Sequence, residues 1–265
     1  MLAFSLAAIF LTGFSYFVLL FYFQAKKPEQ FQLLLKNYLK GSKDAQEEIL
    51  QSLSQLASQL RGQEHRYYHL PEYFKTLAPL MEKFSIWTHW KDVHQMKELL
   101  LWSAIHESRE LVKAFPTEVK AHRALSAAYI DLARLYMDPR KENPDILWVS
   151  PEYQSKEMEE KFQKAAERAV AELKIIEEYA PAEFWVHAQL AVLYRDLKQP
   201  ALEIQEYEML AKMTNNDQEI LFRLGLLYFE QGQNSKGLRI YEALKKAAHP
   251  HADALISFYD AFASI

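Results

Sequence analysis

Histidine is the residue type whose placement first suggests chemistry in this chain. Five of the nine histidines fall between residues 65 and 106, and three of the five tryptophans lie among them. His65 and His69 are four residues apart, so a helix would present both on one face, as zinc ligands are presented. No third ligand follows at a spacing that would complete the site. We therefore predict no metal site, and we keep a metal-binding protein or an enzyme built on residues 65–106 as the alternative class.

Other catalytic signatures are broken or missing. His106 and Glu107 begin a zincin motif, but Glu110 stands where the second histidine is needed. There is no glycine-rich phosphate loop and no Gly-x-Ser-x-Gly nucleophile elbow. The chain has no cysteine, which excludes disulfides, thiolate chemistry and cysteine-bound metal. We expect a protein that is not an enzyme and that binds no cofactor.

The composition indicates a helical protein without a general affinity for nucleic acid. The 31 basic and 35 acidic residues leave a net charge of −4, so no electrostatic attraction to phosphate backbones is expected. Half of the residues are hydrophobic, glycine is rare, and no alternating β-rich run stands out. These features predict an all-α fold with a sizeable core.

The elements that must position any site are repeated. Residues 184–217 and 218–251 carry the same 34-residue pattern. Eight residues of the first copy recur unchanged 34 residues later. They are Leu190, Leu193, Tyr194, Gln199, Tyr207, Glu208, Leu210 and Lys212. A fixed period of this length is typical of stacked helical hairpins, because one hairpin cannot bury its own apolar face.

This pattern resembles the tetratricopeptide repeat (TPR). The family places a small residue eighth, a tyrosine eleventh and an aromatic residue twenty-fourth in each repeat. The matching residues are Ala191 and Gly225, Tyr194 and Tyr228, and Tyr207 and Tyr241. The chain departs at positions twenty and twenty-seven, where alanine is usual and where Glu203, Gly237, Leu210 and Leu244 stand. The resemblance implies an α-solenoid that binds other proteins.

An earlier copy of the repeat is interrupted. Each repeat consists of a first helix, helix A, and a second helix, helix B. Helix A of the interrupted copy aligns with helix A of the next repeat at an offset of 65 residues, and its helix B contains Ala169, Leu173 and Ile176. The extra residues therefore form an insertion at about 138–155, which brings the resemblance to about three repeats over residues 119–251. Within the insertion, Ile146–Val149 is bracketed by prolines and should be extended. Trp148 in this segment would either dock a partner or cover the edge of the repeats.

The TPR resemblance also implies a binding surface, because helix A of each repeat lines the concave groove of that family. Arginine beside aromatic side chains is a common composition of binding hot spots. The groove positions that we single out are Arg123, Trp185, Gln189, Arg195, Phe222, Arg223 and Phe229. The family's carboxylate-clamp variant needs two asparagines, and Ala127 and Gln189 stand there instead. Capture of a chain end is therefore not expected.

The N-terminus carries a different signal. Residues 1–23 contain no charge, and a helix of that length spans about 35 Å, enough to cross a bilayer core. Five lysines follow before Asp44, which predicts a single-pass protein with its N-terminus outside and its C-terminal domain in the cytoplasm. The alternatives are a cleaved signal peptide, with periplasmic or secreted repeats, and a buried helix.

Residues 24–115 should form a helical region between the anchor and the solenoid of residues 116–265. We expect one helix from Pro28 to Lys40, a second to about Arg61 and a long one from about Lys91 to Phe115. Apolar residues within 49–60 form a helix seam, which should pack on the preceding helix or allow self-association. A short helix should close the chain at 252–262.

The sequence therefore predicts a membrane-anchored scaffold or adaptor. It would hold a protein or peptide partner at the membrane during complex assembly. A chaperone of secretion or envelope assembly, with translocated repeats, is the alternative within the same class of function.

Overall fold

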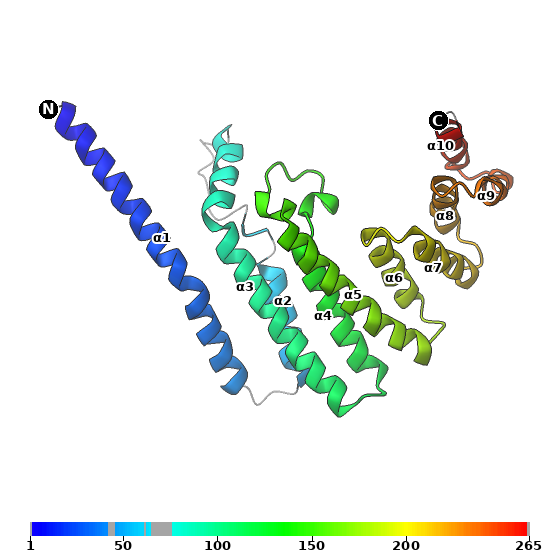
Figure 1. Ribbon diagram of the computed structural model, residues 1–265, viewed down its shortest axis with the longest axis horizontal. Coiled ribbons are helices and arrows are strands. Elements are labelled where there is room, and N and C mark those ends of the chain that lie inside the picture. Colours follow the sequence, from blue (N-terminus) through cyan, green and yellow to red (C-terminus); the bar gives the residue numbers. More distant parts are fainter. Residues whose placement is uncertain (1, 42–45, 61, 65–75, 264–265) are drawn as a thin grey trace. The chain divides into compact units, whose positions relative to one another are not determined.

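The computed structural model describes residues 2–41, 46–60, 62–64 and 76–263 (Figure 1). These residues contain helices and no β-strand, which confirms the predicted all-α class. The helices are α1 (Leu2–Gly41), α2 (Gln46–Gln59), α3 (Ala78–Ala114), α4 (Val119–Tyr136), α5 (Lys156–Tyr179), α6 (Phe184–Asp196), α7 (Pro200–Met213), α8 (Gln218–Glu230), α9 (Asn234–Lys246) and α10 (Ala252–Ala263). Two short 3-10 helices, η2 (Pro139–Lys141) and η3 (Pro151–Gln154), lie between α4 and α5.

The chain divides into two compact units. Unit 1 comprises Met1–Thr117 and Ala127–Ala165, and unit 2 comprises Glu118–Ser126 and Ala166–Ile265. Helices α4 and α5 each contribute residues to both units. The domain boundaries predicted from the sequence, at residues 23 and 115, stay a prediction.

Helix α1 bears on the predicted membrane anchor. The uncharged residues 2–23 are not a separate element, because α1 runs from Leu2 through Lys26, Lys27 and Pro28 to Gly41. Within the described residues, no helix is both long enough and apolar enough to cross a membrane. The predicted anchor is therefore wrong, as is the predicted single-pass localisation with the N-terminus outside and a cytoplasmic C-terminal domain.

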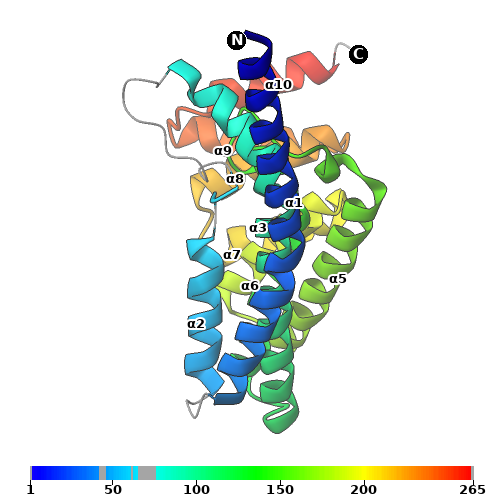
Figure 2. The same ribbon diagram turned by 90° about the vertical axis from the view of Figure 1, so that its left-hand side faces the viewer.

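In unit 1, α1 and α2 both pack on α3 (Figures 1 and 2). Ile49 and Leu53 of the predicted seam are buried, whereas Leu56 is 42% exposed. The seam thus packs mainly on α3, although Tyr38 of α1 also forms a hydrogen bond of 3.1 Å with Ser52 of α2. Burial of Ile49 and Leu53 leaves little of the seam accessible for the predicted self-association.

Helix α3 begins at Ala78, well before the predicted start at Lys91. Pro79 lies in its first turn, where the missing backbone N–H costs nothing, so it starts the helix rather than breaking it. The helix brings part of the histidine-rich region into the core of unit 1. Trp90 stacks on His94 at 4.7 Å between ring centroids, and Tyr153 meets Trp90 edge-on at 5.4 Å.

The insertion is non-helical over residues 146–150, as predicted. Asp138 caps η2 by accepting a hydrogen bond from the backbone N–H of Arg140, and it also binds the Arg140 guanidinium. Ile146 lines a cavity in unit 1, and the ammonium of Lys83 lies 4.4 Å from the centre of the Trp148 ring. Leu147 is 67% exposed.

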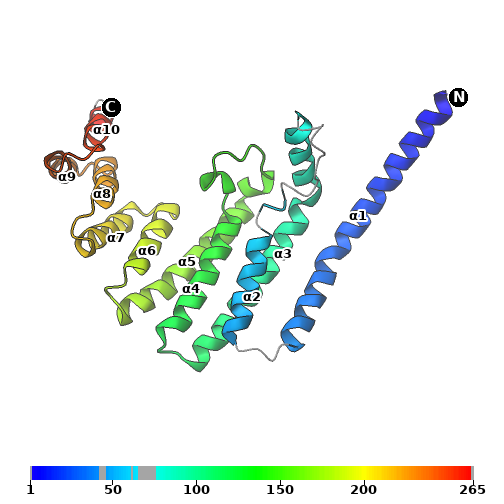
Figure 3. The same cartoon turned by 180° about the vertical axis from the view of Figure 1, so that it is seen from behind.

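In unit 2 the backbone structure repeats with the same 34-residue period as the sequence. Helices α6 and α7 form one hairpin and α8 and α9 the next (Figure 3). The turn inside each hairpin has the same hydrogen bond, from Gln199 N to Tyr194 O at 2.8 Å and from Gln233 N to Tyr228 O at 2.7 Å. The residue before each glutamine is left-handed, Lys198 with φ 57° and Gly232 with φ 68°. The closing helix α10 agrees with the predicted span of 252–262.

One departure from the TPR pattern has a packing reason. A Cβ atom on Gly237 would lie 2.4 Å from the ring of Phe229. The ring therefore occupies the space that the usual alanine would fill at this position. Phe229 is 2% exposed as a result and contacts Tyr259 of α10 at 4.9 Å between centroids.

The residues predicted for helix B of the interrupted repeat are buried. Ala169, Leu173 and Ile176 of α5 each have 0% exposure. They correspond, at an offset of 34, to Glu203, Tyr207 and Leu210 of α7. The helix B of this repeat therefore begins inside α5, after the insertion.

Candidate partner-binding surface

Arg123 and Trp185 form one part of the predicted surface. The guanidinium of Arg123, at the start of α4, lies 5.1 Å from the centre of the Trp185 ring on α6. The same guanidinium donates a hydrogen bond of 2.8 Å to Glu183. The Arg123 side chain is nevertheless 44% exposed, and Trp185 is half-buried. The two residues form a platform that presents both a cation and an aromatic face.

Glu203 and two arginines form the second part. Arg223 of α8 donates a hydrogen bond of 3.1 Å to Glu203 of α7, which is 3% exposed. Burial raises the pKa of Glu203, while the positive charges of Arg223 and Arg195 act in the opposite direction. The ion pair links the two hairpins, which explains why a glutamate stands where the TPR pattern has alanine.

The other predicted groove residues lie in different surroundings. Gln189 is half-buried on α6, and Arg195 is exposed and paired with its neighbour Asp196 at 3.2 Å. Phe222 stacks on His251 at 4.7 Å between centroids. Phe229 belongs to the core, as described above. Trp148 lies in unit 1, whereas the other predicted groove residues lie in unit 2.

The sequence analysis missed two histidine–glutamate pairs in unit 2, in both of which the histidine is buried. His122 Nδ1 lies 2.8 Å from Glu172 Oε2, and His187 Nδ1 lies 2.7 Å from Glu206 Oε2. The histidines are 65 residues apart and the glutamates 34 apart, which are the two repeat offsets. The pairs therefore occupy equivalent positions, each joining helix A to helix B of one repeat. The two repeat offsets, 65 residues for the histidines and 34 for the glutamates, were the sequence signal that could have indicated these equivalent positions.

Charged side chains surround His187. Its Nε2–H donates a hydrogen bond of 3.0 Å to the carbonyl of Pro181, and its Nδ1 faces Glu206. Lys174 bridges Glu177 and Glu206 at 2.7 and 3.1 Å. Burial disfavours the charge on His187, but these acceptors outweigh burial and leave its pKa raised. The four side chains thus form one connected network of hydrogen bonds and ion pairs.

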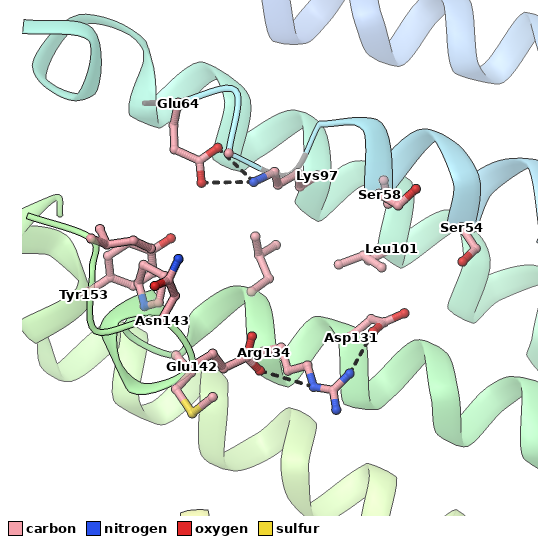
Figure 4. Close-up of a pocket in the computed structure, with 16 residues that line it drawn as sticks. Ser54, Ser58, Glu64, Lys97, Leu101, Asp131, Arg134, Glu142, Asn143 and Tyr153 are labelled. Atoms are coloured by element: carbon pink, nitrogen blue, oxygen red, sulfur yellow. Dashed lines mark hydrogen bonds and ion pairs between the residues drawn. The ribbon is translucent and has the colours of Figure 1, made fainter. Parts of the chain in front are cut away.

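Unit 1 contains a cavity of about 320 Å³ between α2, α3, α4 and the insertion (Figure 4). Figure 4 shows Glu64 and Lys97 on one wall, joined by hydrogen bonds of 2.9 and 3.1 Å. On the opposite wall Arg134 pairs with Asp131 at 3.7 Å and with Glu142 at 3.5 Å. The charges of the wall thus satisfy one another, and the arrangement suggests no particular ligand.

The histidine-rich region does not assemble a metal cluster in the part of the chain that the structure describes. His89 and His94 are buried on α3, at 1% and 6% exposure. His106 is exposed on the same helix. The predicted pair His65 and His69 lies outside the described residues.

No protein-family model matches the chain, and no curated protein matches it. Among solved structures, the chain is similar to the crystal structure of a thermophilic TPR protein from Thermus thermophilus. The similarity has 18% identity and a TM-score of 0.37, over 83% of this chain and 100% of that one. The chain's own contacts show an all-α protein whose C-terminal part repeats a helical hairpin in register.

Proposed function

We propose that the protein is a non-catalytic scaffold whose unit 2 binds a partner protein or peptide during assembly of a complex. The observation that carries the proposal is the platform formed by Arg123 and Trp185. Arginine and tryptophan are the residues that most often dominate binding energy at protein interfaces. Here helices of two successive repeats present them together on the surface.

The platform favours a partner segment that offers a carboxylate next to an apolar side chain. The carboxylate would replace Glu183 at the Arg123 guanidinium, which already uses part of its donor fork. The apolar side chain would cover Trp185, and exclusion of water would strengthen the cation–π contact. Arg195, with its exposed side chain on α6, adds a second cation on the same helix as Trp185.

Site-directed photo-crosslinking in the native cells tests this proposal. A photoreactive amino acid at Gln189, one helical turn from Trp185, should crosslink a partner, whereas the same probe at exposed Lys245 on α9 should not. Arg123→Glu or Trp185→Ala, each added to the Gln189 probe, should abolish the crosslink.

Circular dichroism and thermal melting of each variant provide the folding control. A crosslink at Gln189 that persists in folded variants of both platform residues would exclude the platform as the binding surface. A crosslink obtained only from a probe at Leu147 would move the site to the insertion.

A further inference from the structure

We propose that Glu177, His187 and Glu206 of unit 2 form a binding site for a divalent transition-metal ion, with Zn²⁺ as the best fit. One ligand atom from each residue lies within 4.8 Å of the other two. His187 Nδ1 is 2.7 Å from a Glu206 oxygen and 4.0 Å from a Glu177 oxygen. One nitrogen and two carboxylate oxygens suit zinc, because magnesium and calcium prefer oxygen ligands alone.

The second nitrogen of His187 is held as metal sites require. Ligating histidines almost always donate the other ring N–H to a carbonyl or a carboxylate, which fixes the ring and aims the ligating nitrogen. His187 does this through Nε2–H to the carbonyl of Pro181 at 3.0 Å. The Nδ1 atom is thereby directed at the two carboxylates before any metal arrives.

Lys174 places a positive charge between the carboxylates of Glu177 and Glu206. Its ammonium bridges the two carboxylates, at 2.7 Å from Glu177 and 3.1 Å from Glu206. The Lys174 side chain is 42% exposed, so it can turn into solvent, whereas Glu206 is fixed with a side chain only 6% exposed. The lysine is therefore an internal competitor. The metal ion takes the place of its ammonium, and the proton on His187 Nδ1 leaves to solvent.

The other repeats lack this combination. At the offset of 34, the residues that correspond to Glu177, His187 and Glu206 are Ala211, Leu221 and Ile240, none of which has a ligand atom. The earlier repeat keeps the pair His122 and Glu172, but the residue at Glu177's place is Val112 by the offset of 65. The chain thus contains its own control for a site that needs all three ligands.

Isothermal titration of the chelator-treated full chain with Zn²⁺ tests the proposal. We expect one bound ion, whose affinity falls by about tenfold or more in Glu177→Gln, which leaves the His187–Glu206 pair in place. The double variant His187→Leu/Glu206→Ile, which copies the third repeat, should lose the ion. Lys174→Met should bind it more tightly, because the competing ammonium is gone.

Two controls separate this site from incidental binding to other histidines. His122→Leu/Glu172→Ile should keep the ion, because it removes the pair that lacks a third ligand. His249→Gln/His251→Gln, which removes two adjacent histidines near Glu219, should also keep it. Zinc binding that Glu177→Gln and Lys174→Met leave unchanged would overturn the proposal. So would an absence of binding in both the wild type and Lys174→Met.

Discussion

The two complete hairpins of unit 2 have the same backbone conformation in their turns but differ in the residues that lie between their helices. The hairpin α6/α7 joins its helices through the buried pair of His187 and Glu206. At the same positions, α8/α9 has Leu221 and Ile240, which belong to an apolar cluster. The turn geometry is the same in both. The backbone period therefore does not require the ion pair.

The largest effect should come from breaking the buried pair of His187 and Glu206. Glu206→Ile alone leaves His187 and Lys174 without the carboxylate that they share, and we expect a loss of about 3 kcal/mol in the free energy of unfolding. His187→Leu/Glu206→Ile should recover most of this loss, because the pair of residues then matches α8/α9. Denaturant unfolding at neutral pH and without metal measures both. If the double variant is no more stable than the single one, the two hairpins are not interchangeable at this position.

The second prediction concerns the packing of α8/α9. Gly237→Ala places a methyl group 2.4 Å from the Phe229 ring and should cost about 2 kcal/mol. Phe229→Leu in the same chain should reduce the penalty, because a smaller side chain gives room to the methyl group. Ala169 shows that the repeat itself accepts alanine here.

Gly225→Ala serves as the comparison for that change, since its new methyl group would meet the end of the Leu255 side chain at 2.8 Å. Leucine can change rotamer more cheaply than a buried ring can move, so we expect a smaller loss. Equal stability of Gly237→Ala and the wild type in thermal melting would mean that the ring does not fix this position.

The hairpins were predictable from the sequence because their signal is local and periodic. Helix positions, the small residues and the buried tyrosines follow from one 34-residue offset. Phe229 shows the limit of that reasoning. Its place in helix A suggested an exposed groove position, but the lack of a side chain at Gly237, on another helix, opens a space that the ring fills. Such exchanges between helices depend on packing and have no signal in either helix alone.

The two parts of the candidate surface differ in how far the sequence could predict them. Arg123 and Trp185 come from different repeats, and the TPR resemblance predicted both as groove positions, which stays a prediction. The buried charge of Glu203 was noticed only as a departure, since its partner Arg223 is 20 residues away and belongs to the next hairpin. The N-terminal prediction failed for another reason. It rested on the uncharged run of residues 1–23, but within the described residues no helix is both long enough and apolar enough to cross a membrane.

The third prediction extends the comparison to a buried histidine of unit 1 that has no carboxylate on its ring. Burial lowers the pKa of His94 to about 4, helped by Lys97 and Lys161 and opposed by Glu98 and Glu64. The unfolded chain therefore binds a proton more readily than the folded chain below pH 6.5. The stability associated with uncharged His94 should be fully present above pH 6.5. The free energy of unfolding should fall by about 2 kcal/mol between pH 7 and pH 5.

His94→Phe should remove this part of the pH dependence in denaturant unfolding at the two pH values. His89, whose pKa burial also lowers to about 4 with a contribution from Lys27, adds a similar slope that remains in the variant. Exposed His106→Gln is the matched control and should leave the slope unchanged. A slope that is the same in wild type and His94→Phe would show that His94 is solvated in the folded protein.

The smallest effect should come from exchanging the turn residues of the two hairpins. Lys198 and Gly232 occupy the same left-handed position, with φ of 57° and 68°. A side chain in this region is strained by about 1 kcal/mol, whereas glycine adopts it freely and is the common residue after a helix end. Lys198→Gly should therefore stabilise α6/α7 by up to about 1 kcal/mol, reduced by the greater freedom of glycine in the unfolded chain. Gly232→Lys should destabilise α8/α9 by a similar amount. If thermal melting shows both changes to be destabilising, the Lys198 side chain makes a favourable contact, and the two turns are alike in backbone only.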